Sequence, residues 1–113
     1  MSQIIELENE AVRLRSEGRT DAEIETLLKI LELDETFARA HLALAVAYGK
    51  VGNFAASVAH GERACQVEPN DAFNFTALSV TYQRAYAGTN DHSYIRKAED
   101  AKDLAQRVRA ATR

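Results

Sequence analysis

The sequence of 113 residues contains one cysteine, one proline, five glycines and no tryptophan. A single cysteine excludes an internal disulfide framework and a zinc cluster built from several cysteines. So few helix breakers leave little room for linkers and favour long helices. No stretch approaches the roughly 18 apolar residues that a membrane span needs. The first twenty residues alternate in charge and lack an apolar run of signal-peptide length. We therefore expect a cytoplasmic protein.

The net charge of −3 is unevenly distributed along the chain. Residues 1–37 carry −6, residues 38–71 are balanced, and residues 72–113 carry +3. Such asymmetry permits head-to-tail contact between molecules. A chain of this length forms one domain, here 1–113, with room for a real core but little for an elaborate active site.

Residues 38–71 contain two apolar runs at helical spacing, separated by Gly52-Asn53 and closed by Pro69-Asn70-Asp71. This unit of 34 residues predicts a helix–turn–helix hairpin. Because such a hairpin cannot bury its apolar face alone, the unit also predicts stacked neighbours. A shift of 34 residues brings similar residues into register: Leu14 with Tyr48 and Tyr82, Ala11 with Ala45 and Ser79, Val12 with Val46 and Val80, and Gly18 with Gly52.

The central unit carries an ordered set of residue types, namely Leu44-Ala45, Tyr48, Gly52, Phe54, Ala64 and Pro69. Together with the 34-residue period, this set resembles the tetratricopeptide repeat (TPR) family over nearly the whole chain. The resemblance implies an all-α fold, a right-handed superhelix of about six antiparallel helices in three hairpins. The repeats would span about 4–37, 38–71 and 72–113, the last being irregular and capping the stack. His41 departs from the usual early aromatic residue, and Glu23 from a usual small residue.

We predict helices at about 3–17, 20–33, 37–51, 54–67, 71–86 and 91–111, with Ser2, Asn53 and Asn70 as N-caps of three of them. Thr20-Asp21-Ala22-Glu23 predicts a capping box at the start of the second helix. In strict register, the polar run 89–93 would fall inside a helix, where such residues compete with the backbone. We therefore predict seven inserted residues in the third repeat, with a longer bend at 87–89.

No constellation of catalytic or metal-binding residues is apparent. His41, His60 and His92 lack the spacing of a zinc-binding helix. His41 and Cys65 fall on apolar helix faces, where a packed structural role is expected. Ser57 lies three residues before His60, but without an orienting acid the pair is weak evidence for a hydrolase. We expect no enzyme activity, no cofactor and no metal, and neither a nucleic-acid nor a membrane partner.

In the TPR family, the first helices of the hairpins line a concave groove that binds peptides. The resemblance places these residues in the groove: Val12, Arg15, Arg39, Leu42, Val46, Lys50, Phe73, Thr76, Val80 and Arg84. The three valines would form an apolar stripe, and the basic residues against Glu8 would give a local charge near +3. An apolar floor with a basic rim suits a peptide that mixes acidic and hydrophobic residues. The structural alternative is that Val12 and Val46 pack between neighbouring helices and that the surface arginines are solvated.

The sequence thus predicts a non-enzymatic protein–protein interaction scaffold. The alternative is a structural module that assembles with itself, head to tail or as a dimer, through its oppositely charged ends. One TPR subclass grips acidic chaperone tails through Lys, Asn and Arg side chains on three helices. The matching positions here hold Glu8, Val12, Ala43, Phe73 and Ala77, which argues against a co-chaperone of that type.

Overall fold

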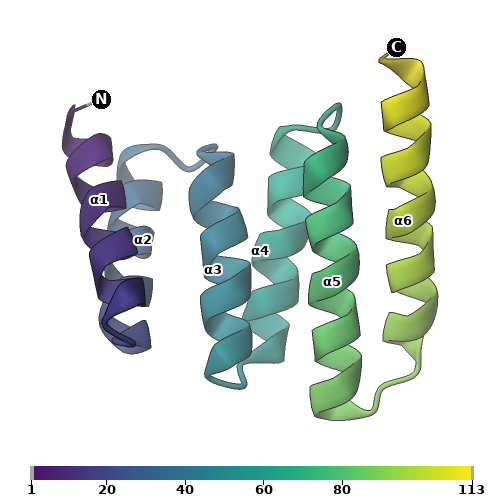
Figure 1. Ribbon diagram of the computed structural model, residues 1–113, viewed down its shortest axis with the longest axis horizontal. Coiled ribbons are helices and arrows are strands. Elements are labelled where there is room, and N and C mark those ends of the chain that lie inside the picture. Colours follow the sequence, from purple (N-terminus) through teal and green to yellow (C-terminus); the bar gives the residue numbers. More distant parts are fainter. Residues whose placement is uncertain (1, 113) are drawn as a thin grey trace.

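The computed structural model describes residues 2–112, which form six α-helices and no strand within that range. The helices are α1 (Ser2–Ser16), α2 (Thr20–Leu33), α3 (Ala38–Lys50), α4 (Phe54–Val67), α5 (Ala72–Thr89) and α6 (Ser93–Ala111). Consecutive helices run in opposite directions and follow one another across the molecule (Figure 1). This arrangement confirms the predicted all-α fold class.

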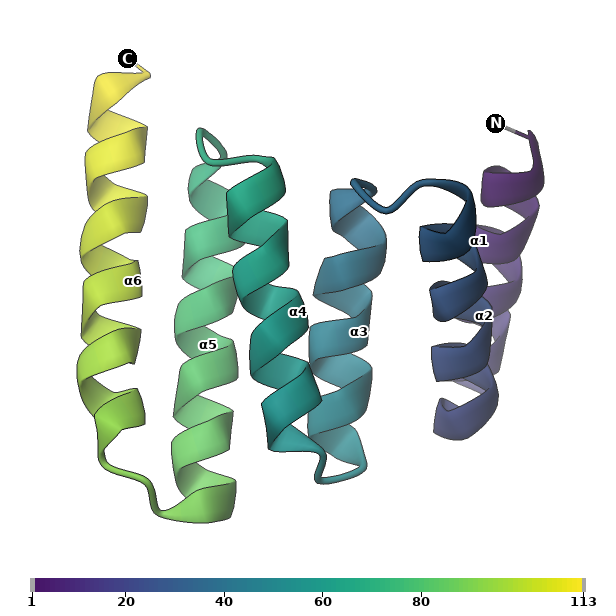
Figure 2. The ribbon, with the colours of Figure 1, turned by 180° about the vertical axis from the view of Figure 1, so that it is seen from behind.

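The helices pair into the hairpins α1–α2, α3–α4 and α5–α6, and adjacent hairpins meet through α2 and α3 and through α4 and α5. The hairpins turn progressively along the stack. In Figure 1, α2 lies mostly behind α1, α4 lies behind and to one side of α3, and α6 lies beside α5. Figure 2 shows α2 and α4 in front when the molecule is seen from the other side. Helices α1, α3 and α5 therefore form one surface, which we call the inner-helix face.

Small side chains are among the most deeply buried residues of the stack. Ala40, Ala47, Ala64 and Ala85 are each no more than 1% exposed. Three of these alanines belong to two apolar clusters. The first joins α1, α2 and α3 through Ile4, Ala11, Ile24, Leu27, Ile30, Ala40, Leu44 and Ala47, and the second joins α4, α5 and α6 through Val58, Cys65, Leu78, Tyr82, Ala85, Ala98 and Ala101. Each hairpin thus buries its apolar side against a neighbour, as a repeat stack requires.

The bend of the third hairpin differs from the prediction. The bend expected at 87–89 is wrong, because α5 continues to Thr89. The helix ends at Asn90, which adopts a left-handed φ of 60° and donates its backbone N–H to the Tyr86 carbonyl at 2.8 Å. The Thr89 hydroxyl donates to the Ala85 carbonyl at 2.7 Å. This bond accommodates a polar side chain in the last turn, so the extra residues lengthen α5 instead of the loop.

The helix starts are only partly as predicted. Asn53 caps α4 by accepting a hydrogen bond from the Ala56 N–H at 3.2 Å, as expected. α5 is capped by Asp71, which accepts from the Phe73 N–H, so the expected cap at Asn70 is wrong. The Ser2 side chain lies outside the described part of the structure. The capping box at Thr20 is also wrong, because α2 starts without a side-chain cap and Glu23 is buried.

The extended end of α5 packs closely on Phe54. A Cβ atom added at Gly88 would overlap two carbons of the Phe54 ring, which lies against the second core cluster. We expect Gly88→Ala to lower the free energy of unfolding by about 1–2 kcal/mol in urea titration, since overpacking costs about 1–3 kcal/mol and helix propensity returns up to about 1 kcal/mol.

The matched control is Gly49→Ala, also within a helix. Its added Cβ would meet only the Ser57 Oγ, at 3.5 Å, which is an ordinary contact. This variant should be as stable as the native chain or more so. Equal stability of the two variants would contradict the close packing of Gly88 on Phe54.

Candidate interaction surface

Five large apolar side chains are exposed on the inner-helix face. Val12, Val46 and Val80, one repeat apart, are 56%, 39% and 39% exposed. Ile5 and Phe73 occupy a second matching position and are 52% and 66% exposed. These five side chains are half of the ten large hydrophobic residues that are exposed in the described range. Packing between helices therefore leaves a large part of the Val12 and Val46 side chains exposed, where a ligand could contact them.

A cavity of about 260 Å³ lies between α1 and α3 on this face. Its lining is mainly apolar, from Ala11, Val12, Leu27, Ala40, Leu42 and Ala43, with Glu8, Arg15 and Arg39 as the charged members. Four predicted binding residues (Val12, Arg15, Arg39 and Leu42) are thus brought together around one hollow. An apolar cavity of roughly 150 Å³ accommodates benzene. The hollow therefore has room for one large apolar side chain of a ligand.

The other predicted residues belong to the same face but do not line this cavity. They are Val46 and Lys50 on α3, and Phe73, Thr76, Val80 and Arg84 on α5. The exposed Thr76 hydroxyl donates to the Ala72 carbonyl at 3.2 Å, within its own helix. These six residues are spread over the surface of α3 and α5, outside the cavity, where a ligand could contact them.

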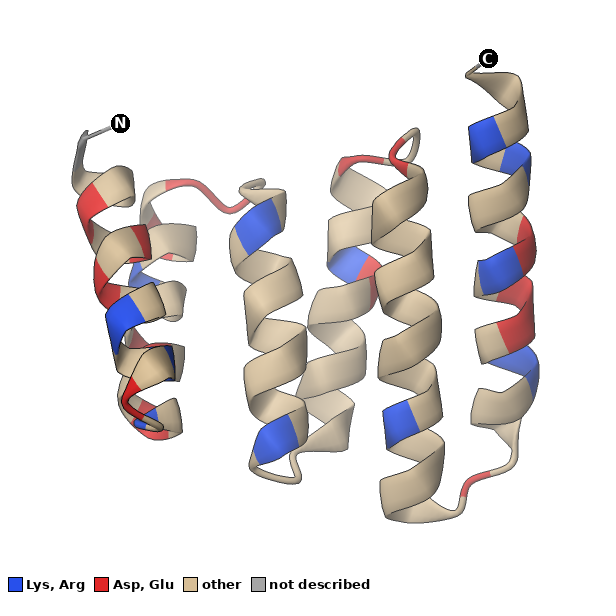
Figure 3. Cartoon of the chain, in the orientation of Figure 1, with Lys and Arg blue, Asp and Glu red and all other residues tan. Residues whose placement is uncertain are grey.

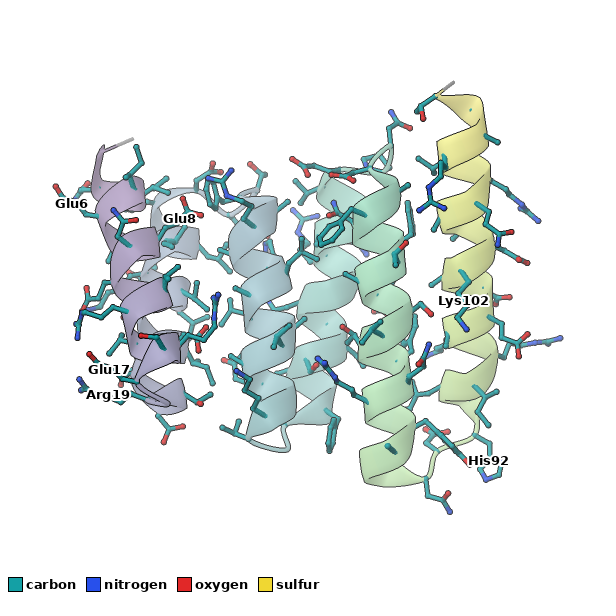
Figure 4. The ribbon with its side chains drawn as sticks, viewed as in Figure 1. Glu6, Glu8, Glu17, Arg19, His92 and Lys102 are labelled. Carbon is teal, nitrogen blue, oxygen red and sulfur yellow. The ribbon has the colours of Figure 1, made fainter. Side chains whose placement is uncertain are left out.

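Two arginines of the predicted basic rim are already ion-paired. Arg39 donates two hydrogen bonds, each of 2.9 Å, to the two carboxylate oxygens of Glu8. Glu8 projects from α1 towards the start of α3 (Figure 4). The hydrogen bond and charge of Glu8 raise the pKa of Arg39. Arg39 and Glu8 therefore cross-link the first two hairpins, and an incoming carboxylate has to compete with Glu8.

The second ion pair, between Arg15 and Glu23, is partly buried and was not predicted from the sequence. Arg15 Nε donates to Glu23 Oε2 at 2.8 Å, and the Glu23 side chain is only 2% exposed. The other oxygen, Glu23 Oε1, is buried without a hydrogen-bond partner. A sequence signal did exist, because Glu23 stands where TPR-like helices usually have a small residue. A carboxylate at such a position needs a cation from the facing helix.

The remaining positive charge lies at one end of the face. Lys50 and Arg84 are one repeat apart, and within residues 2–112 neither makes an ion pair. Figure 3 shows basic segments near the same end of α3 and α5. With Glu23 included, four cations face two carboxylates, so the local charge is nearer +2 than the predicted +3. The basic rim is thus confined mainly to Lys50 and Arg84.

The residues considered for catalysis have other roles. The Ser57 hydroxyl donates to the Ala45 carbonyl at 2.5 Å and therefore does not donate to His60. Burial raises the pKa of the Cys65 thiol to about 11, which keeps it protonated and unreactive at neutral pH. His41 is 3% exposed, consistent with its predicted packed role.

Across the described residues, no group of three or more possible ligands surrounds a metal site. None of the six helices is both long and apolar enough to cross a membrane.

The two ion pairs provide a prediction about stability. Removing one partner of a buried pair costs about 3–5 kcal/mol. Because the Arg15 side chain is 42% exposed, we expect Arg15→Ala to lower the free energy of unfolding by about 1–3 kcal/mol. Arg39→Ala breaks an exposed pair and should lower it by no more than about 1 kcal/mol.

Thermal or urea unfolding of the two single variants measures this difference. The double variant Arg15→Met/Glu23→Gln carries no uncompensated charge, so it should recover much of the loss in Arg15→Ala. Equal effects of Arg15→Ala and Arg39→Ala would contradict a stabilising role for the buried pair.

The geometry matches a known solved structure. The structure described as "TPR2B-domain:pHsp70-complex of yeast Sti1" aligns with a TM-score of 0.66, over 95% of this chain and 98% of that one, at 15% sequence identity. At this identity, the likeness shows the fold alone. A scan of protein-family models and a search of curated proteins each find no match. The chain therefore has a TPR-like fold, a superhelix of helical hairpins.

Proposed function

We propose that this chain is a non-enzymatic interaction module that binds a peptide or a helix of another protein on its inner-helix face. The observation that carries the proposal is the set of five exposed apolar side chains on α1, α3 and α5, together with the α1–α3 cavity, which Val12 lines. Exposed apolar residues that gather on one surface are typical of interaction sites. The TPR-like fold supports the same class of function, because the TPR2B domain of Sti1 is described in a complex with pHsp70.

The ligand would combine an apolar side chain with a carboxylate. The apolar side chain would enter the cavity between α1 and α3, beside Val12 and Leu42. The carboxylate would lie near Lys50 and Arg84, which have no intramolecular ion pair among the described residues. Arg and Lys side chains without a partner attract carboxylates more readily than those already paired. This arrangement would orient the ligand across the three helices.

The ligand is proposed to differ from an acidic chaperone tail. The positions with which TPR co-chaperones grip such tails hold Glu8, Val12, Ala43, Phe73 and Ala77 here. Glu8 would repel a carboxylate, and its own oxygens are occupied by Arg39. The other four side chains cannot donate hydrogen bonds to a carboxylate.

The charges at the two ends of the stack do not favour head-to-tail assembly. At the N-terminal end, Glu6, Glu10 and Glu32 surround Leu7 and Leu33, with Lys29 as the one cation, and Glu6 points away from the stack (Figure 4). The part of α6 around Arg96 is not correspondingly basic, because Glu99, Asp100 and Asp103 lie beside it. This part of the last repeat therefore does not complement the acidic end.

Positions at both ends are polar where the interior of the stack is apolar. Glu6 and Glu10 are exposed, whereas the residues one repeat later, Ala40 and Leu44, belong to the first core cluster. Once the seven inserted residues of the third repeat are added to the 34-residue period, Glu99 aligns with Val58. Glu99 is exposed, whereas Val58 belongs to the second cluster. Stacking a second copy on either end would bury these carboxylates, which is costly without partners.

Sedimentation at low salt and high concentration should therefore show a monomer. A salt-sensitive oligomer would contradict the proposal that the ends of the stack do not assemble.

The binding proposal can be tested with a random peptide library displayed on phage and selected on the immobilised protein. Selected peptides should combine large apolar residues with Asp or Glu. Val46→Glu places a charge in the centre of the apolar face, and we expect it to weaken binding of a selected peptide at least about tenfold, or about 1.4 kcal/mol. Lys50→Glu should weaken acidic peptides selectively.

The matched control is Leu33→Glu, because Leu33 is 50% exposed but lies at the N-terminal end of the stack. Circular dichroism and urea unfolding would establish that all three variants are folded. Unchanged peptide affinity in folded Val46→Glu, or an equal loss in Leu33→Glu, would exclude the inner-helix face as the binding site.

A further inference from the structure

Two histidine side chains meet between the helices of the central hairpin. His41 Nδ1 lies 3.0 Å from His60 Nδ1, and His41 Nε2 lies 2.8 Å from the backbone carbonyl oxygen of Glu35. The His60 ring stacks on Tyr48 with 5.6 Å between ring centres. His41 is 3% exposed, and His60 is half-buried. The contact joins α3, α4 and the loop between α2 and α3.

The proton positions in this contact follow from its partners. A carbonyl oxygen only accepts hydrogen bonds, so His41 Nε2 must carry a proton. In neutral His41, Nδ1 is then the acceptor, and His60 Nδ1 must be the donor. The neutral pair therefore has a single arrangement, in which His60 donates to His41 and His41 donates to the loop.

We infer that His41 and His60 form a proton-sensitive latch that holds α3 against α4 and opens when both rings are charged. One added proton is tolerated, since a single N–H can still point from one Nδ1 to the other. A second proton leaves two N–H groups facing each other across 3.0 Å, with no acceptor between them. The folded hairpin cannot hold two protonated rings in this geometry, so the rings must separate.

The surrounding charges do not relieve this conflict. The Glu35 carboxylate lies 3.6 Å from His41 Nε2, but both its oxygens also accept hydrogen bonds from Arg63, at 2.8 and 2.6 Å. Glu35 and Arg63 together are neutral, and Tyr48 is the other titratable group against the pair. In the described chain, no hydrogen bond, ion pair or ring contact reaches either imidazole from α2 or α5. One neutralised carboxylate does not compensate two cationic rings.

The sign of the pH effect follows from proton linkage. Burial and the nearby His41 lower the pKa of His60 in the folded protein. The unfolded chain therefore takes up a proton at His60 that the folded chain binds more weakly, once the pH falls below the ordinary histidine pKa of about 6.5. The stabilising effect of the pair is complete above that pH and is lost as the pH falls through it. Each refused proton raises the unfolding equilibrium constant up to about tenfold per pH unit.

The latch lies behind the proposed binding surface. His41 immediately precedes Leu42, and both belong to α3, which also carries Val46. Separation of α3 from α4 would shift these side chains relative to those of α1. Acidification would then act on the central hairpin first, since it carries both rings of the pair.

The test is urea unfolding of the native chain and two variants between about pH 7.5 and about pH 5, the range in which histidine titrates. His60→Gln keeps an N–H donor for His41 but cannot be protonated. We expect its unfolding midpoint to fall much less on acidification than that of the native chain. His92→Gln is the matched control, because His92 is exposed at the start of α6 and should leave the native pH dependence unchanged.

Nitrogen-15 NMR of the native protein gives a second readout that does not depend on a variant folding. At about pH 7.5, the ring shifts should show an Nε2–H tautomer for His41 and an Nδ1–H tautomer for His60. On acidification, amide signals of α3 and α4 should change before those of α1 and α6. Retention of the native pH dependence in folded His60→Gln, or the opposite tautomers in the native protein, would overturn the latch.

Discussion

Ala40, Ala47, Ala64 and Ala85 are each no more than 1% exposed, and three of them lie in the two apolar clusters that join the helices. Short side chains let helix backbones approach closely, and this approach sets the spacing of the whole stack. Because alanine buries little apolar area, the larger residues of the two clusters must fill the space around these contacts. The position that Val12, Val46 and Val80 share on the inner helices lies outside both clusters. Val12, Val46 and Val80 are left exposed there by the same geometry that closes the core.

Polar groups inside the stack fix how its helices are aligned. Ser57 bonds to the Ala45 carbonyl, the Asn74 amide to the Ala64 carbonyl at 3.4 Å, and the Tyr82 hydroxyl to Glu62 at 2.6 Å. Each bond links two helices and is satisfied only in one register. A buried polar network of this kind specifies a unique arrangement, since a shifted helix would leave its groups unpaired.

The repeat period was sufficient to predict the fold. The first four helices appear where the 34-residue register and the turn residues placed them, because hydrophobic spacing and glycine turns are local signals. The length of α5 was not predicted, since the polar run after Ala87 reads as a loop by composition. In the structure, Thr89 bonds back to its own helix and Asn90 provides the left-handed turn. Such local compensation depends on side-chain geometry that composition does not contain.

The candidate surface was predictable in position but not in charge. The TPR resemblance proposed the helices and residues of this surface, and the three valines among them are exposed. The pairing of Arg15 with Glu23 and of Arg39 with Glu8 depends on which side chains face each other across helices. The pairing of His41 with His60 arises in the same way, from residues 19 positions apart. Spacing along one helix cannot reveal contacts that are set by the crossing of two.

The central claim is that the surface formed by α1, α3 and α5 binds a peptide. NMR titration of the labelled protein with a peptide selected on it tests this most directly, because amide shifts report contact residue by residue. The account predicts that the largest shift changes lie near Val12, Leu42, Val46 and Val80, with little change in α2 and α6. Changes concentrated on α2, α4 or α6, with α3 unaffected, would contradict it.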